Sequence, residues 1–181
     1  MNIFKNINLK TWKIISVFAI FGLSALFHFI YIWFPSFFTS LLFPVNESIW
    51  EHNKIIIGAF LVWSIFEKLT LRKTQDLNTC YNGFISAVVC CFLVMLIFSP
   101  IYFFILKTND NMIVTLIIYF ICIALSVYLN YKLLEQDYNH EKEKKVILLW
   151  LLVMVINAIL TYYPLKLPIF YDYNSNTYGL K

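Results

Sequence analysis

The side chains best suited to bind an ion or move a proton are concentrated in one short stretch of this sequence, PVNESIWEHNK. It contains Glu47, Glu51 and His52, and His28 lies inside the long apolar run that precedes it. Imidazole and carboxylate groups are common zinc ligands, and a zinc-bound water can attack an ester or phosphoester. The sequence therefore predicts a polar pocket formed by these residues and by Asp172, the only acidic residue of the C-terminal tail.

Helical spacing decides which of these groups would meet. Asn46 is a common N-cap residue, so we expect a helix to begin near Glu47. Glu47 and Glu51 would then share one stripe of that helix, and Ser48 and His52 the neighbouring stripe. Carboxylates four residues apart repel each other slightly, so Lys54, the helix dipole, a bound cation or a shared proton must offset the repulsion.

Two interpretations of this cluster stay open. In the first, it is a ligand pocket, and His28, Glu51 and His52 are its candidate metal ligands. In the second, it is a helix start whose polar groups satisfy one another and face water. The HExxH zinc signature is absent, which makes a metal the less favoured occupant. The sequence identifies no cofactor and does not decide whether the chain is an enzyme.

The composition excludes an ordinary soluble domain. Of the 181 residues 61% are hydrophobic and 13% are charged, against about 25% charged in average globular chains. The net charge of +4 comes from short basic clusters between apolar runs, which is typical of membrane topology and not of nucleic-acid binding. We therefore expect the lipid bilayer, and no nucleic acid, as the partner.

Apolar runs of about 20 residues predict an all-α, polytopic membrane helix bundle that forms a single domain over residues 1–181. The segment 35–45 is apolar but too short to cross, so we expect it to lie at the interface. The tail 164–181 is long enough to fold back over the polar cluster. The five predicted transmembrane helices are 12–34, 47–70, 83–106, 112–131 and 146–163.

The basic residues predict an orientation with the N-terminus inside and the C-terminus outside, because cytoplasmic loops are rich in Lys and Arg. With this orientation ten basic residues lie inside: Lys5, Lys10, Lys13, Lys68, Arg72, Lys73, Lys132, Lys142, Lys144 and Lys145. Four lie outside: Lys54, Lys107, Lys166 and Lys181.

Two stretches carry a family resemblance. The first is FPVNESIWEH, from Phe43 to His52, and the second runs from Tyr163 to Gly179 and includes LPIFYD and TYG. Together they resemble the signature of a family of small bacterial multi-pass membrane proteins of unknown function. The resemblance implies a location in the bacterial cytoplasmic membrane, and it implies no activity.

The sequence favours a membrane protein that binds an ion, a small solute or a partner at a polar pocket on the outer face. The alternative is a membrane-embedded, metal-dependent hydrolase that acts on lipid. Because five helices are few for a transporter, a transport role would imply a homo-oligomer.

Overall fold

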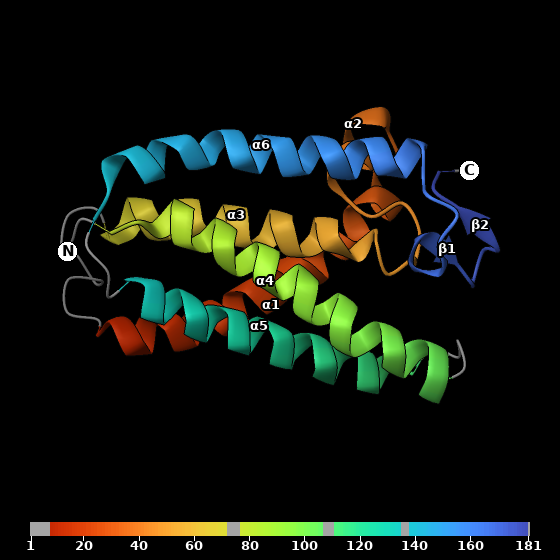
Figure 1. Ribbon diagram of the computed structural model, residues 1–181, viewed down its shortest axis with the longest axis horizontal. Coiled ribbons are helices and arrows are strands. Elements are labelled where there is room, and N and C mark those ends of the chain that lie inside the picture. Colours follow the sequence, from red (N-terminus) through yellow and green to blue (C-terminus); the bar gives the residue numbers. More distant parts are fainter. Residues whose placement is uncertain (1–7, 72–76, 107–110, 135–137, 181) are drawn as a thin grey trace.

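A computed structural model describes residues 8–71, 77–106, 111–134 and 138–180, and it is mainly helical. Five long helices run along the long axis of the molecule, and the chain reverses direction from each to the next (Figure 1). The long helices are α1 (Leu9–Trp33), α3 (His52–Leu71), α4 (Thr79–Pro100), α5 (Met112–Leu134) and α6 (His140–Tyr162). A short helix, α2 (Phe37–Leu42), follows α1 and lies within the predicted interfacial segment 35–45.

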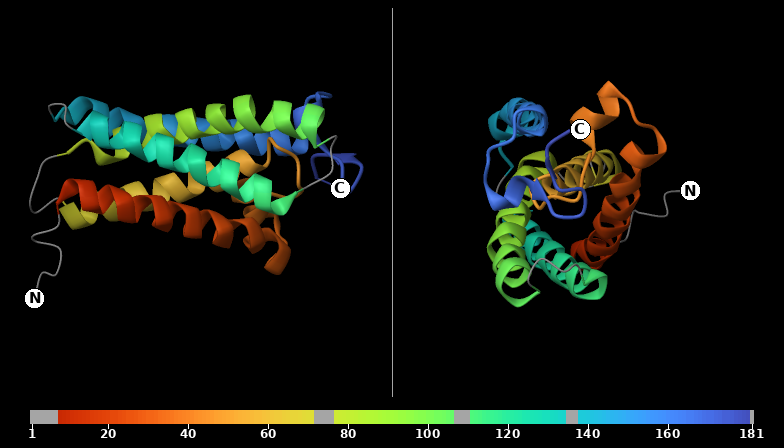
Figure 2. Two further views of the ribbon diagram at one scale, coloured as in Figure 1. Left: turned by 90° about the horizontal axis from the view of Figure 1, so that it is seen from below. Right: turned by 90° about the vertical axis from the view of Figure 1, so that its right-hand side faces the viewer.

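The remaining elements are small. Helix α4 continues into a π-helical turn, η1 (Ile101–Ile105). The tail forms a 3-10 turn, η2 (Pro168–Phe170), followed by a two-stranded antiparallel sheet. Its strands are β1 (Tyr171–Asp172) and β2 (Thr177–Tyr178). We call the end of the bundle that carries this tail the tail end, and the opposite end, where α1 begins, the amino-terminal end (Figure 2).

Four helices are long and apolar enough to cross a membrane by length and composition. They comprise α1, α4 with η1, α5 and α6, which agree in position with four of the five predicted spans, although α4 and α6 begin earlier, at Thr79 and His140. Their outward faces are apolar, with Phe18, Leu96 and Leu148 more than 60% exposed. These observations support a small multi-pass membrane protein.

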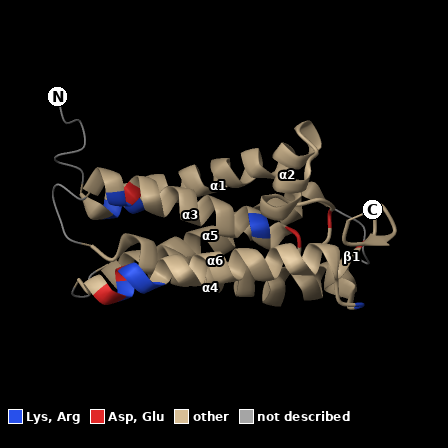
Figure 3. Cartoon of the chain, turned by 90° about the horizontal axis from the view of Figure 1, so that it is seen from above, with Lys and Arg blue, Asp and Glu red and all other residues tan. Residues whose placement is uncertain are grey.

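Helix α3, the predicted second span, is not among these four because it carries Lys54, Glu67 and Lys68. It is nevertheless a central element, since it packs against α1, α4 and α6. Ile56, Ala59 and Phe60 on this helix are among the most buried residues of the chain. Charged residues gather toward the two ends of the bundle and leave its middle apolar (Figure 3).

A buried ion pair joins three helices at the amino-terminal end. The Nζ atom of Lys13 on α1 lies 2.5 Å from Oε1 of Glu67 on α3 and 2.6 Å from Oδ1 of Asn130 on α5. The indole N–H of Trp12 also donates to Oε1 of Glu67, at 2.8 Å. A buried charge is tolerated only when it is paired and hydrogen-bonded, and these contacts meet that condition.

A second buried carboxylate fixes the start of α4. Glu143 on α6 accepts hydrogen bonds from the backbone N–H groups of Cys80 and Tyr81, at 3.1 and 3.0 Å. The ammonium of Lys68 lies 3.0 Å from the same carboxylate. Glu143 therefore accepts hydrogen bonds from backbone amides that have no partner within the helix. Its negative charge also lies at the helix N-terminus, the positive end of the helix dipole, where it is stabilised.

The orientation predicted from the basic residues depends partly on positions outside the described residues, namely Lys5, Arg72, Lys73, Lys107 and Lys181. The structure contains no bilayer, so it fixes the relative directions of the helices and not the side of the membrane that each end faces.

Replacing Lys13 by Met should lower the free energy of unfolding by about 3–5 kcal/mol, because the Glu67 carboxylate would remain buried without its counter-charge. Chemical or thermal unfolding in detergent would measure the loss. The double variant Lys13→Met/Glu67→Leu should recover part of it, and Lys142→Met, which changes an exposed lysine, is the matched control. A loss in the double variant equal to the sum of the two single losses would show that the pair is not coupled.

Candidate functional site

The loop 43–51 carries the polar stretch and lies at the tail end, beneath the tail (Figure 2). Three contacts hold it there. The backbone N–H of Trp50 donates to the carbonyl of Ile169 at 2.9 Å, and the Trp50 ring stacks on Phe170 with a centroid separation of 4.7 Å. The side-chain amide of Asn46 donates to the carbonyl of Gly179 at 2.8 Å.

These contacts correct the predicted start of the second helix. Helix α3 begins at His52 and not at Glu47, and Asn46 is not its N-cap. The N–H of Trp50, which a helix would pair with the Asn46 carbonyl, donates to the tail at Ile169 instead. The Oγ of Ser48 accepts the N–H of Glu51 at 3.4 Å and so closes the turn that leads into α3.

Glu51 directly precedes α3, and its side chain is buried. Its Oε2 lies 2.8 Å from Nζ of Lys54 and accepts the N–H of Val45 at 3.1 Å. Its Oε1 accepts the hydroxyl of Thr161 on α6 at 2.7 Å. Both oxygens of Glu51, a candidate metal ligand from the sequence, therefore already have partners within the protein.

The structure brings His28, Glu47 and His52 together. Nε2 of His28 lies 3.5 Å from Oε1 of Glu47, and Nε2 of His52 lies 3.6 Å from Oε2 of the same carboxylate. The two imidazole rings are 5.4 Å apart between centroids. One donor atom from each of the three residues lies within 4.8 Å of the other two. We call these three residues the His–Glu–His cluster.

Each member of the cluster comes from a different element. His28 lies in the last part of α1, Glu47 in the loop and His52 at the first residue of α3. All three side chains are partly exposed, with 25% of His28, 27% of His52 and 42% of Glu47 accessible. An ion from the surrounding water could therefore reach the cluster without a large rearrangement.

A backbone carbonyl fixes the proton on His52. Nδ1 of His52 lies 2.8 Å from the carbonyl oxygen of Ser48, which can only accept a hydrogen bond, so Nδ1 carries the hydrogen. In the neutral ring Nε2 then carries no hydrogen, and its lone pair faces the Glu47 carboxylate. Two facing acceptors need a proton or a cation between them. A histidine whose second nitrogen donates to a carbonyl is also the usual arrangement around a bound metal.

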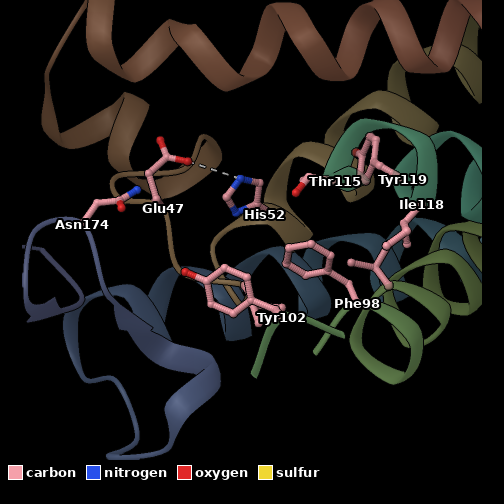
Figure 4. A pocket seen from close by; sticks show the side chains of 10 residues that line it. Glu47, His52, Phe98, Tyr102, Thr115, Ile118, Tyr119 and Asn174 are labelled. Atoms are coloured by element: carbon pink, nitrogen blue, oxygen red, sulfur yellow. Dashed lines mark ion pairs between the residues drawn. The ribbon is translucent and has the colours of Figure 1, made fainter. Parts of the chain in front are cut away.

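A small cavity adjoins the cluster. It measures about 70 Å³ and lies between α3, α4, η1, α5 and the tail. Glu47 and His52 stand at its polar side together with Asn174, while Phe98 and Ile118 form part of its apolar wall (Figure 4). Tyr102, Thr115 and Tyr119 add hydroxyl groups. This space suits water molecules or a small hydrated ion and not a bulky solute.

Asp172 lies outside the His–Glu–His cluster and supports it indirectly. Its buried carboxylate accepts the N–H of Asn174 at 2.8 Å and the hydroxyl of Ser175 at 2.5 Å, and it also accepts the backbone N–H of Glu47. Burial alone would raise the pKa of Asp172, but these hydrogen bonds outweigh it and hold the pKa below its ordinary value. Asp172 therefore fixes the backbone of a cluster residue.

The chain matches, over residues 1–180, the family described as "Family of unknown function (DUF6512)". The chain belongs to this family. The resemblance to a family of unknown function is thereby confirmed, and the four long apolar helices fit a small multi-pass membrane protein. No curated protein and no solved structure is similar enough to match. Within this family, function has to be argued from the site itself.

Sequence reasoning missed several residues of the candidate site. Tyr102, Thr115 and Tyr119 line the cavity from η1 and α5, more than 45 positions after His52, and nothing in their local pattern distinguishes them from other apolar-face residues. Asn174 lies in the polar turn of the tail, and its position beside Glu47 depends on how the tail folds back.

The depressed pKa of Asp172 predicts a pH-dependent contribution to stability. Because the folded pKa lies below the unfolded one, the contribution is complete above the unfolded value, about 4, and disappears as the pH falls through the folded pKa. The melting temperature of Asp172→Asn should therefore lie below that of the wild type at pH 7, and the difference should narrow below about pH 4. Ser175→Ala, which removes only one donor, is the milder control. A difference that stays constant down to pH 3 would contradict this assignment.

Proposed function

We propose that this protein binds a transition-metal ion of the zinc class through His28, Glu47 and His52, at the outer face of a cell membrane. The observation that supports this most directly is the pair of contacts on His52. Its Nδ1 faces a carbonyl oxygen, and its Nε2 faces a carboxylate that a second imidazole also approaches. That arrangement presents three donor groups toward one point.

The distances suit an ion better than direct hydrogen bonds. Separations of 3.5 and 3.6 Å between imidazole nitrogens and carboxylate oxygens exceed the roughly 2.7–2.9 Å of a charge-assisted hydrogen bond. Ligands at about 2.1 Å from a tetrahedral zinc ion are about 3.4 Å from one another. One donor atom of each residue lies within 4.8 Å of the other two, so the cluster has to contract by at most about 1.4 Å to close around zinc.

The donor set favours one class of ion. Calcium and magnesium prefer oxygen ligands throughout, whereas imidazole nitrogen suits zinc, copper, nickel and iron. Two nitrogens and one carboxylate leave at least one position of a tetrahedral ion open. That position is available to water or to a ligand from the adjoining cavity.

Binding is better supported than lipid hydrolysis. A zinc hydrolase uses a general base that is separate from the metal ligands to take a proton from the bound water. Among the described residues that line the cavity, the only carboxylate and imidazole groups belong to Glu47 and His52. Both are members of the donor set, so neither is free for that role.

For the membrane arrangement, we propose that α3 is a fifth span and that the tail end faces the outside. By composition, its charged residues keep α3 from being counted as a membrane span. Most of these charges are neutralised inside the bundle, because Lys54 pairs with Glu51 and Glu67 pairs with Lys13. The alternating directions of the five long helices fit five crossings (Figure 1). The basic-residue count supports the orientation, since most Lys and Arg residues would then lie inside.

Purified protein should bind about one equivalent of Zn²⁺ or Co²⁺. His28→Ala and His52→Ala should each weaken binding at least tenfold, because each removes a ligand, whereas His140→Ala should leave it unchanged. His140 is exposed on α6 at the other end of the bundle, which makes it a matched control. Isothermal titration calorimetry and the visible spectrum of the cobalt form would measure affinity and geometry.

The same titration should weaken as the pH becomes acidic, because protons compete with the metal for imidazole nitrogens and the carboxylate. Equal zinc affinity in the wild type and in His28→Ala/His52→Ala would rule out the site. The melting temperature of the double variant should be unchanged, which would show that it is folded and that any loss of zinc binding comes from the missing ligands.

The orientation is open to cysteine labelling, because all four natural cysteines are buried and should give little background. A membrane-impermeant maleimide should label Leu165→Cys, an exposed position of the tail, in intact cells. It should label Lys144→Cys, at the amino-terminal end, only after the cells are permeabilised. The reverse pattern would place the His–Glu–His cluster on the cytoplasmic side.

A further inference from the structure

A second hollow lies far from the His–Glu–His cluster, on the lipid-facing side of the bundle. It is an open groove of about 200 Å³ between α1 and α5 at the amino-terminal end. Its wall is apolar, with Val17 on α1 and Ala124 and Val127 on α5. All of its described lining residues belong to these two helices, so the groove opens sideways between them and not into the interior of the bundle.

One end of the groove is polar and basic. Lys10 and Lys13 contribute from α1, and Tyr128 and Tyr131 from α5. These residues lie close to the helix ends, where tyrosine rings and lysine ammonium groups reach the headgroup level of a bilayer. The groove therefore changes, within two helical turns, from a surface that suits a hydrocarbon chain to one that suits a charged headgroup.

Three lysines lie at or beside this end of the groove: Lys10 and Lys13 line it, and the ammonium of Lys132 lies 5.5 Å from the ring centroid of Tyr131. Lys13 is compensated by Glu67, and it uses two of its three ammonium donors on Glu67 and Asn130. Lys10 is exposed, and within the described part of the chain it has no ion-pair partner. An anionic ligand would supply a counter-charge for Lys10, whereas a neutral zwitterion would leave its charge uncompensated.

We propose that this groove binds one anionic phospholipid of the leaflet at the amino-terminal end. The phosphodiester lies beside Lys10, and an acyl chain follows the wall formed by Val17, Ala124 and Val127. Tyr128 and Tyr131 line the same end, and their hydroxyl groups can donate to phosphate or ester oxygens. The ligand class is an anionic phospholipid with an uncharged headgroup alcohol, such as phosphatidylglycerol. This inference does not depend on metal binding at the other end.

Native mass spectrometry of the full chain would test the proposal with two lipids that share acyl chains, phosphatidylglycerol and phosphatidylcholine. The wild type should retain phosphatidylglycerol about fivefold better, the preference expected from one lysine near a phosphate. Lys10→Gln should lose most of this preference, because it removes the uncompensated lysine that lines the groove. Lys144→Gln, which removes an exposed lysine at the same end of the bundle on α6, should keep the preference.

A second variant separates the groove from simple surface charge. Ala124→Trp fills the apolar wall without changing any charge, so it should lower retention of both lipids while the melting temperature without lipid stays close to that of the wild type. Glycerol phosphate, which has the headgroup but no chain, should not displace the bound lipid. An unchanged phosphatidylglycerol preference in Lys10→Gln, or undiminished retention in Ala124→Trp, would overturn the proposal.

Discussion

The carboxylate of Glu51 is the interaction on which the tail end of the molecule depends. It accepts the N–H of Val45 in the loop, the hydroxyl of Thr161 on α6 and the ammonium of Lys54 on α3. Lys54 in turn donates to the carbonyl of Ser40 on α2, at 2.7 Å. Four segments of the chain therefore meet around one buried ion pair. Because an unpaired charge would be costly there, the conformation that satisfies all of these donors is strongly preferred.

This arrangement explains how charged residues can lie within a bundle that faces lipid. At the tail end Lys54 is held by Glu51, and at the amino-terminal end Glu67 is held by Lys13. Both pairs involve α3, which packs against α1, α4 and α6. Lys54 and Glu67 of α3 thus lie where neighbouring helices shield their charges, while the four helices apolar enough to span a membrane present apolar surfaces outward.

The apolar runs predicted the long helices because a bilayer-length run of hydrophobic residues leaves little choice of conformation. The start of α3 was predicted wrongly because the local rule for an N-cap competes with tertiary contacts. Asn46 makes a cap-like bond, since its Oδ1 accepts the N–H of Ser48 at 2.9 Å, but the N–H of Trp50 donates to Ile169 and not along a helix, which no local pattern could reveal. The contact of Glu51 with Thr161 could not be predicted for the same reason, since Thr161 lies 110 positions away.

For the candidate site, the type of a residue predicted which side chains could take part, but helical spacing did not predict which of them would meet. His28 was identified as an unusual group inside an apolar helix, and the structure does place it beside His52. The carboxylate that accompanies them is Glu47 and not Glu51, because the loop geometry turns one toward the histidines and the other into the core. Such a choice depends on a few backbone angles in a non-helical segment, which neither composition nor periodicity encodes.

The dependence of the loop on the tail also has a consequence for biosynthesis. Residues 43–51 are translated long before Ile169 and Gly179, whose carbonyls accept hydrogen bonds from Trp50 and Asn46. Until α6 has been inserted and the tail has emerged, those donors on the loop have only water or lipid headgroups as partners. Glu47 therefore reaches its place between the two histidines only in a late step of assembly, after the helices that surround it are already in the bilayer.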